Sequence, residues 1–544
     1  MNLSCEKSET LSASRAVSSR PRSFFEKSAT LIMALCFCGI IFFSLGDYGM
    51  TWDEVVYFDA GQSYFTWLRE PSLENIDSYW AINHEHPPVL KLLGGISQYV
   101  FHEKWHLLNR VSSFRLAILI FVFLSNYFLF LLTAELFNAR IAFIATVIFF
   151  FLPRVFFHSH LGAMDYPLTS FWIMVIYFYR KGMQDAKWVM VASILLGFAF
   201  LTKINAFLLY IPLLFYWVLT QAGQFQEIIH PRPRFSLRQI RPVLGKFFPL
   251  LIIPSILLVD LWPWLWKDTW ARIVEYFSFH KGHYLIYVYY LGVQNNVTPW
   301  HYPWVLTGVT VPLITLVPFL VGVIHIVFFP SKIKVWVLFN ALFPLLVISL
   351  PSVPKYDGVR LFLPAFPFIA IIAGMGIYQM GLWARKKRFE KVFYVAYIVL
   401  FLLTIHSSII KIHPYQSSYY NELVGGTEGA VKKGFEAEYW GNAYIGILPW
   451  LNEHSDRTFW VYMADLAPQV LGAFELYKKE GLLKEKVQFG GRKHSYYLIL
   501  LIRQGFFNEE MWRYYKHSEP VFSVKLSHTP LVNVYDLKEF RPRR

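Results

Sequence analysis

The sequence predicts a polytopic all-α membrane protein with about 11 transmembrane helices and a small C-terminal extracytoplasmic α/β domain. Of its 544 residues, 55% are hydrophobic and only 16% are charged, whereas soluble domains carry about 25% charged residues. Stretches such as 31–45 and 306–329 approach or exceed the roughly 20 apolar residues that cross a bilayer. After residue 410 the long apolar runs give way to short ones, which predicts a separate domain.

The net charge of +15 comes from short basic clusters between the apolar runs. The positive-inside rule explains such clusters, so they argue against nucleic acid as a partner. The three cysteines, Cys5, Cys36 and Cys38, lie before or within the first apolar run. They therefore predict neither an extracytoplasmic disulfide framework nor a zinc cluster.

Eleven apolar stretches are expected to span the membrane: 29–46, 113–136, 139–157, 165–180, 187–202, 203–220, 246–263, 304–329, 334–351, 359–382 and 391–410. Basic clusters occur in 1–28, 232–246 and 385–388. Eleven spans threaded from a cytoplasmic N-terminus place all three clusters in the cytoplasm and the C-terminus outside. The first span is expected to be an uncleaved signal anchor, with a cleaved signal peptide as the alternative.

The expected domains are a basic cytoplasmic segment (1–28), a transmembrane domain (29–410) and the extracytoplasmic α/β domain (411–544). The long outer loop 47–112 is expected to form amphipathic helices on the membrane surface. Its interfacial anchors are expected to be tryptophans, at Trp52, Trp67, Trp80 and Trp105. In the last domain, alternating patterns predict strands at 458–463, 496–502 and 521–526, with helices at 466–479 and 508–517.

Acidic residues at the outer ends of spans are the first candidates for chemistry. Asp53 and Glu54 follow the first span, and Asp165 opens the fourth. A carboxylate at the membrane interface is partly desolvated, which raises its pKa towards that of a useful base. The alternatives are a solvated loop for the first pair and a helix-dipole partner for Asp165.

The segment His84-Glu85-His86-Pro87-Pro88 leads to Lys91. The prolines fix an extended turn and aim the group in one direction, although they also suit the simple start of a helix near Val89. His84 and His86 with a carboxylate would suit a divalent metal, but their spacing is weak evidence for one. No other cofactor is indicated.

Isolated cations also lie at outer span ends, against the positive-inside trend. A bound anion such as phosphate would explain them, and snorkelling to lipid headgroups is the alternative. These residues are Arg110, Arg115, Lys203, Lys355 and Arg360. Acids and cations from separate outer segments suit a reaction between a phosphate-bearing lipid and an acceptor that arrives from outside.

These motifs resemble those of glycosyltransferase family 39. Trp52-Asp53-Glu54-Val55 is similar to the family's Asp-Glu motif, and His86-Pro87-Pro88 with Lys91 is similar to His-Pro-Pro-Leu-Gly-Lys, with Val-Leu in place of Leu-Gly. The stretch from His160 to Pro167 is similar to the second acidic site. Arg110 with Ser112-Ser113 resembles an Arg-x-Pro-Ser element that lacks its proline. The resemblance covers about residues 45–385 and is specific only in combination.

The family includes the dolichyl-phosphate-mannose protein mannosyltransferases and the bacterial lipid A aminoarabinose transferase, which are multispan proteins of the GT-C fold. The resemblance implies transfer of a sugar from a polyprenyl-phosphate donor to a protein, lipid or glycan acceptor. It implies Asp53 as the catalytic base and Glu54, Asp165 and His86 as orienting residues. The implied lipid-phosphate contacts are Lys91, Arg110, Lys203 and Arg360.

The eukaryotic branch of the family carries a large domain between the seventh and eighth spans, where this chain has only the short loop 264–303. The resemblance therefore implies a bacterial-type enzyme of the plasma (inner) membrane. Two alternatives stay open from the sequence. One is a transporter or flippase of a lipid-linked saccharide, although no internal repeat is evident. The other is a different polyprenyl-donor membrane transferase.

Overall fold

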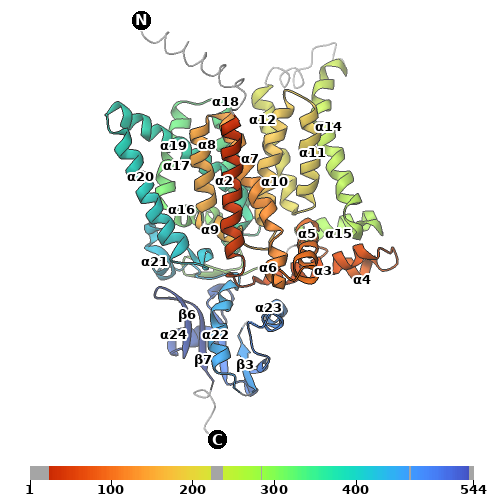
Figure 1. Cartoon of the computed structure of the whole chain (residues 1–544), viewed down its shortest axis with the longest axis vertical. Helices are drawn as coiled ribbons and strands as arrows, with labels where there is room; N and C mark the ends of the chain where they lie inside the picture. Colours follow the sequence, from red (N-terminus) through yellow and green to blue (C-terminus); the bar gives the residue numbers. More distant parts are fainter. Residues whose placement is uncertain (1–23, 222–236, 283–284, 457, 465–466, 538–544) are drawn as a thin grey trace.

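The computed structural model describes residues 24–221, 237–282, 285–456, 458–464 and 467–537. It has two layers, a bundle of long helices and a strand-containing C-terminal domain at one end of it (Figure 1). The two layers contact each other through the segments that follow the last bundle helix and through the loop 47–112, whose first helix packs against the helix at 468–479.

Each of the expected spans is helical over most of its length. The helices are α2 (Phe24–Ser44), α7 (Ile118–Leu136), α8 (Ala139–Phe151), α10 (Asp165–Gly182), α11 (Lys187–Phe200), α12 (Tyr210–Thr220), α14 (Leu237–Asp260), α16 (Tyr302–Thr310), α17 (Leu313–Phe328), α18 (Lys332–Ser349), α19 (Phe366–Lys386) and α20 (Glu390–Ile405). Four helical segments of the described chain are long and apolar enough to cross a membrane, namely 110–136, 332–349, 360–386 and 390–410. The count of eleven therefore stays a prediction.

The eighth expected span is two helices rather than one. α16 ends at Thr310 and α17 begins at Leu313. Pro312 cannot donate a backbone hydrogen bond and disfavours the helical region for the residue before it. Val311 accordingly has φ −87° and ψ 126°, so the break follows from the sequence.

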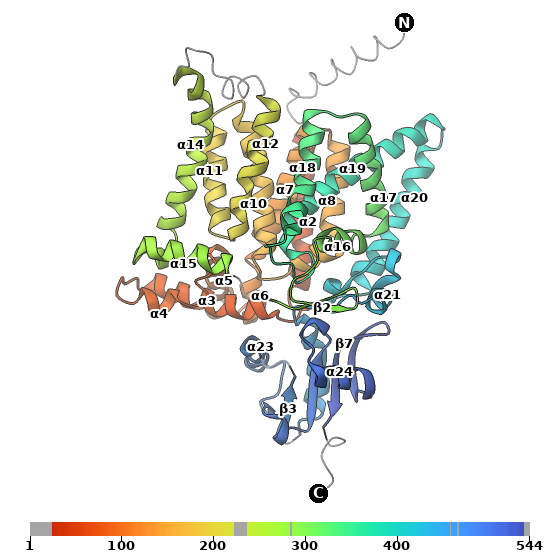
Figure 2. The same cartoon turned by 180° about the vertical axis from the view of Figure 1, so that it is seen from behind.

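The loop 47–112 forms a layer of helices across the end of the bundle that lies next to the C-terminal domain. It contains α3 (Trp52–Arg69), α4 (Ile76–Trp80), α5 (Val89–Gln98) and α6 (Arg110–Arg115), and α15 (Thr269–Lys281) lies with them (Figure 2). Two of the expected interfacial anchors were predicted wrongly. Trp67 and Trp80 are 3% and 0% exposed, because Trp80 stacks on Tyr64 with ring centroids 4.2 Å apart and Trp67 packs edge-on against it.

The C-terminal domain contains one five-stranded sheet in the order β4-β3-β5-β7-β6. The strands are β3 (Phe459–Met463), β4 (Val487–Phe489), β5 (Tyr497–Leu501), β6 (Phe522–Leu526) and β7 (Thr529–Asp536). β3 pairs in parallel with β4 and β5, and β7 pairs antiparallel with β5 and β6. The expected strands are present at β3, β5 and β6, and the expected helices are α23 (Pro468–Lys479) and α24 (Glu509–His517).

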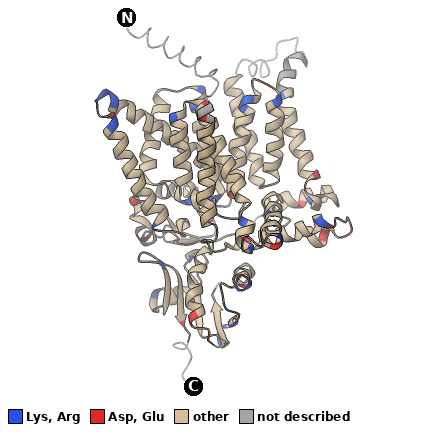
Figure 3. Ribbon diagram, in the orientation of Figure 1, with Lys and Arg blue, Asp and Glu red and all other residues tan. Residues whose placement is uncertain are grey.

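Residues 411–456 link the two layers and are mostly short helices, including α21 (Gly426–Lys432) and α22 (Leu448–Glu453). The backbone N–H of Asn421 donates to the Val309 carbonyl, and its side chain donates to the carbonyls of Gly308 and Val311. This segment therefore packs against the bundle. Lys and Arg residues mark the opposite helix ends, most visibly at 385–388 between α19 and α20 (Figure 3).

Candidate active site

The centre of the site is an ion pair between Asp53 and Arg360. Thr51 caps the N-terminus of α3 and places Asp53 in its first turn. Arg360, which opens the 3₁₀ turn before α19, donates from Nη1 to Asp53 and from Nη2 to Asp357 at 2.8 Å. Its guanidinium lies 4.7 Å from the ring centroid of Trp440. Asp53 is 26% exposed and Arg360 is 8% exposed, so the carboxylate remains accessible.

A second ion pair joins Asp165 at the start of α10 to Lys203, with Nζ 2.5 Å from Oδ1. Lys203 is held in extended backbone after α11. The Val89 N–H donates to the Leu201 carbonyl at 3.0 Å, which joins this segment to the His-Pro-Pro loop. The two side chains are 3% and 11% exposed. Asp165 and Lys203 were both predicted as site residues, but their spacing in the sequence did not indicate that they pair.

Tyr57 lies near both ion pairs. It lies one turn after Asp53 on α3 and interacts electrostatically with Asp53, Arg360 and Asp165. Burial raises the pKa of Tyr57 well above its ordinary value, and the Asp53 carboxylate adds to this shift. The phenol therefore keeps its proton at neutral pH and can donate a hydrogen bond.

His86 lies beside Tyr57, with ring centroids 5.9 Å apart. Burial lowers the pKa of His86 well below its ordinary value, and the charge of Lys91 lowers it further. The imidazole is therefore neutral, and its buried Nδ1 has no hydrogen-bond partner within the described residues.

Other buried polar atoms around the ion pairs share this property. In the part of the chain that the structure describes, no partner is found for His158 Nδ1 and Nε2, Arg360 Nε, Tyr439 Oη, Trp440 Nε1 and Arg503 Nε. About 90% or more of buried polar groups in folded proteins have a partner. Unpartnered polar atoms beside the two ion pairs suit a site that takes a polar ligand.

Arg154 is a site residue that sequence reasoning missed. It lies in α9 (Pro153–His158), is 2% exposed, and has no carboxylate partner among the described residues. Its Nη2 and Nε lie 3.3 and 3.4 Å from the Tyr419 carbonyl, and its guanidinium faces the ring of Tyr420 at 4.9 Å. The available signal was a cation inside the expected span 139–157, because ionisable groups at that depth usually have a function.

Glu54 points away from the site. Its carboxylate forms two 2.8 Å bonds to Nε and Nη2 of Arg115 and accepts the Gly162 N–H at 2.6 Å. Arg115 also donates to the carbonyls of Leu45, Tyr48 and Gly49. Both side chains are fully buried, at 0% and 1% exposed. This pair fastens α3 to α6 and to the end of α2.

Lys91 and Arg110 also lie outside the cluster. Lys91 Nζ donates to the carbonyls of Asn83 and His86, both at 2.7 Å, and to the Tyr64 hydroxyl at 3.1 Å. It is 0% exposed and closes the His-Pro-Pro loop. Arg110 is 39% exposed and lies 3.9 Å from Glu480 of the C-terminal domain.

The described residues contain no group of three or more His, Cys, Asp or Glu side chains suited to a metal ion. His84 points away from His86, with Nε2 3.0 Å from Glu275 and Nδ1 2.8 Å from the Ala81 carbonyl. The pair therefore does not form the metal site that its composition allowed.

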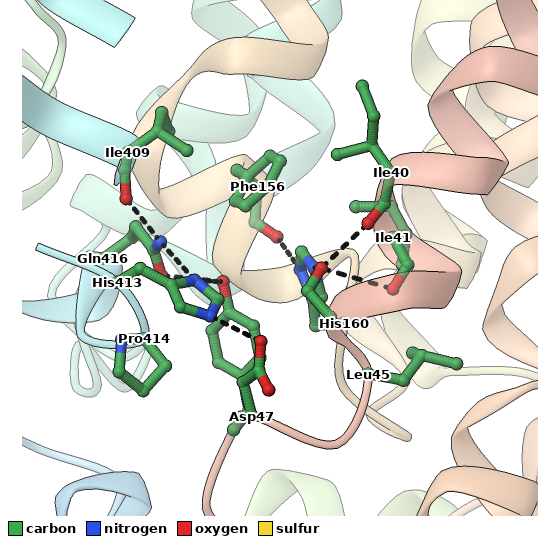
Figure 4. Close-up of polar contacts among 12 residues, drawn as sticks. Ile40, Ile41, Leu45, Asp47, Phe156, His160, Ile409, His413, Pro414 and Gln416 are labelled. Atoms are coloured by element: carbon green, nitrogen blue, oxygen red, sulfur yellow. Dashed lines mark hydrogen bonds and ion pairs between the residues drawn. The ribbon is translucent and has the colours of Figure 1, made fainter. Parts of the chain in front are cut away.

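An apolar groove of about 810 Å³ opens between α2, α8, α19 and α20. At the end of the groove nearer the C-terminal domain, His160 bonds Ser44 at 2.8 Å and His413 bonds Asp47 at 2.8 Å (Figure 4). Tyr48 packs against His160, with ring centroids 4.3 Å apart and the ring planes tilted by 31°. The aromatic pairs Tyr48–Phe157 and Phe157–Trp440 continue from there to the Arg360 side. This aromatic wall lies between the groove and the charged site.

Glu436 lies behind the site, where Oε1 accepts the N–H groups of Gly505 at 2.9 Å and Tyr289 at 3.2 Å. Burial raises the pKa of Glu436 to about 7, although the charge of Arg503 opposes the shift. The folded protein therefore binds a proton here that the unfolded chain releases above pH about 4.5.

This proton makes Glu436 lower the stability as the pH rises from about 4.5 to 7. We expect Glu436→Gln to remove the effect, because the amide oxygen can still accept both N–H groups. The free energy of unfolding of the variant, relative to that of wild type, should rise by up to about 3 kcal/mol between pH 5 and pH 8. Thermal unfolding in detergent at both pH values measures the gain. An equal difference at the two pH values would contradict it.

The chain has relatives of known type. Residues 85–231 match the family model of the dolichyl-phosphate-mannose-protein mannosyltransferases. No curated protein matches the chain significantly. The structure of ArnT from Cupriavidus metallidurans bound to undecaprenyl phosphate is 13% identical, covers 92% of this chain and 97% of its own, and has a TM-score of 0.51.

A second similar structure is the archaeal oligosaccharyltransferase AglB from Archaeoglobus fulgidus, in complex with an inhibitory peptide and a dolichol-phosphate. It is 12% identical, covers 88% of this chain and 70% of its own, and has a TM-score of 0.43. The fold over most of the chain is thus that of ArnT. Together with the family match over 85–231, this similarity of fold supports a membrane glycosyltransferase of the GT-C type.

Proposed function

We propose that this glycosyltransferase moves a hexosyl or pentosyl group from a polyprenyl-phosphate carrier to an acceptor on the extracytoplasmic side, with inversion. The observation that supports this most is the convergence of cations and unpartnered donors around Asp53. Lys203 pairs with Asp165, and Arg360 pairs with both Asp53 and Asp357. Arg154 has no carboxylate partner among the described residues. A phosphate group would satisfy these cations and the unpartnered N–H groups beside them.

The proposed reaction needs mainly correctly placed charges from the protein. Phosphate is a good leaving group, so the sugar can depart without a general acid. The site must stabilise the phosphate charge and remove a proton from a hydroxyl acceptor. Asp53 is the base in this proposal, because its carboxylate is the accessible one, at 26% exposed against 3% for Asp165. An acceptor that is itself a phosphate or carboxylate would need no base.

Lys203 and Arg360 are the proposed phosphate contacts, and Asp165, His86 and Tyr57 the proposed orienting groups. Bound undecaprenyl phosphate in the ArnT structure of the same fold supports the class of carrier. The basic cluster 385–388 lies opposite the C-terminal domain. By the positive-inside rule, the proposed orientation in a bacterial plasma membrane therefore has that domain outside.

The test measures release of free polyprenyl phosphate from a panel of polyprenyl-phosphate sugars, in liposomes that contain the purified protein and an acceptor extract. We expect release with one donor, and at least about 100-fold less with Lys203→Met, because a preorganised charge at the leaving group is lost. Lys267→Met is the matched control. Lys267 is an outer-face lysine paired with Asp77, and it is 52% exposed.

Movement of labelled lipid between leaflets without any release would instead identify a transporter. Equal release by Lys203→Met and wild type would keep the enzyme but remove Lys203 from the proposed phosphate site. Gel filtration of each variant shows whether it is folded.

A further inference from the structure

We infer that Arg503 of the C-terminal domain is a positioning residue that holds Arg360 in place through Asp357. The catalytic role of Arg503 in this inference rests on the proposed function. The physical link itself can be tested without any activity. It would give the C-terminal domain a role in the reaction, although that domain begins beyond the expected spans.

The link is a chain of alternating charges. One carboxylate oxygen of Asp357 lies 2.8 Å from Nη2 of Arg503, and the other lies 2.8 Å from Nη2 of Arg360. Nη1 of Arg360 contacts Asp53. Asp357 and Arg503 are each 3% exposed, so solvent screens the pairs little. Each charge in the chain therefore depends on its neighbours.

Arg503 is itself held firmly. Its Nη1 donates to the Tyr439 carbonyl at 2.5 Å, and its guanidinium lies 3.8 Å from the ring of Phe506. It also lies 4.6 Å from the ring of Trp52, the residue directly before Asp53. Arg503 thus contacts the base's own helix end as well as the carboxylate that holds the base's partner.

The backbone at Asp357 adopts an uncommon conformation, which its two arginine partners stabilise. Asp357 has φ +53° and Gly358 has φ +67°, a left-handed pair that an aspartate adopts only at some cost. Only glycine fits at position 358, because a Cβ there would lie 2.7 Å from Arg154 Nη1 and 2.9 Å from the Tyr439 ring. Two guanidinium groups on one carboxylate stabilise this turn and fix the direction of Arg360.

Loss of Arg503 should alter how Asp357 titrates. Burial raises the pKa of Asp357 above its ordinary value, while Arg503 and Arg360 oppose the shift. Without Arg503 the pKa rises further, so Asp357 becomes protonated at a higher pH and releases Arg360. The charged and titratable groups that interact with Asp357 are Arg503, Arg360, Asp53, Asp165, Tyr302, Glu436 and Tyr439.

The experiment compares wild type, Arg503→Met, Arg503→Lys, Asp357→Asn and the double variant Arg503→Met/Asp357→Asn in liposomes. We expect Arg503→Met to lower kcat by up to about 100-fold, as a misplaced catalytic group does, and to raise donor KM, because Arg360 is also a proposed contact of the donor phosphate. The acid limb of its pH profile should move to higher pH. Arg503→Lys should restore part of kcat, because one ammonium can still reach Asp357. Arg492→Met is the control, since Arg492 is a 44% exposed arginine of the same domain.

Thermal unfolding of the same set tests the link independently of activity. We expect Arg503→Met to lower the unfolding temperature at pH 8, and to lower it less in the Asp357→Asn background. The inference would be overturned if the two substitutions shifted the unfolding temperature additively, or if Arg503→Met had the kcat and pH profile of wild type. If the wild-type protein showed no donor-dependent release, the proposed function would be overturned instead. The unfolding temperatures of the single and double variants would still test whether Arg503 and Asp357 are coupled.

Discussion

Replacement of Asp53 by Asn is expected to lower kcat by about 10²- to 10⁴-fold, the usual contribution of a positioned base. Asparagine has the same shape but cannot take a proton from an acceptor hydroxyl. It also leaves Arg360, which now pairs with Asp53 and Asp357, with more attraction for the donor phosphate. Donor KM should therefore stay the same or fall. Initial rates of polyprenyl phosphate release at varied donor concentration measure both constants.

Asp59→Asn is the matched control for this prediction. Asp59 lies on the same helix, less than two turns further on, and its side chain is exposed. Its variant should release polyprenyl phosphate at the wild-type rate. If Asp53→Asn also does so with a hydroxyl acceptor, Asp53 is not the base, and Asp165 becomes the next candidate. A wild-type rate only with a phosphate- or carboxylate-bearing acceptor would fit a mechanism without a base.

The helical framework could be predicted because apolar length is a local property of the chain. The break at Pro312 was missed, because the apolar run 304–329 is long enough for one span, although the proline itself signals a helix end. Strand β7 was missed because Thr529 to Asp536 follows a tight turn, with Ser527 at φ +55°, and pairs with its neighbours β5 and β6 only in the fold. The burial of Trp67 and Trp80 depends on packing partners such as Tyr64, and a pattern of hydrophobicity does not identify such partners.

The site could be predicted only in part, for a similar reason. Asp53, Asp165, Lys203 and Arg360 were identified because each interrupts the apolar pattern at an outer span end. Their pairing was not, since it depends on how the helices pack. Arg503 and Asp357 gave no signal, because their charges are unremarkable in outer segments until the fold buries them at 3% exposure. The neighbours Asp53 and Glu54 differ by about 100° around the helix, and sequence alone does not tell which one faces the site.

Loss of the Glu54 carboxylate is expected to have the largest effect on stability. Glu54→Ala leaves Arg115, which is 0% exposed, without its bidentate partner. An unpaired buried charge costs about 3–5 kcal/mol. The variant should therefore unfold at a much lower temperature or fail to accumulate in membranes. Thermal unfolding in detergent, followed by gel filtration, gives the size of the effect.

The double variant Glu54→Leu/Arg115→Met separates this structural role from a catalytic one. Replacing both charges with apolar side chains of similar volume removes the unpaired charge, and such replacements are often neutral for stability. The carbonyls of Leu45, Tyr48 and Gly49 lose a donor, so recovery should be partial. If Glu54 only fastens α3, each folded double-variant molecule should turn over at close to the wild-type rate, because Asp53 keeps its place in the first turn. A stable double variant with no turnover would show that Glu54 takes part in the reaction after all.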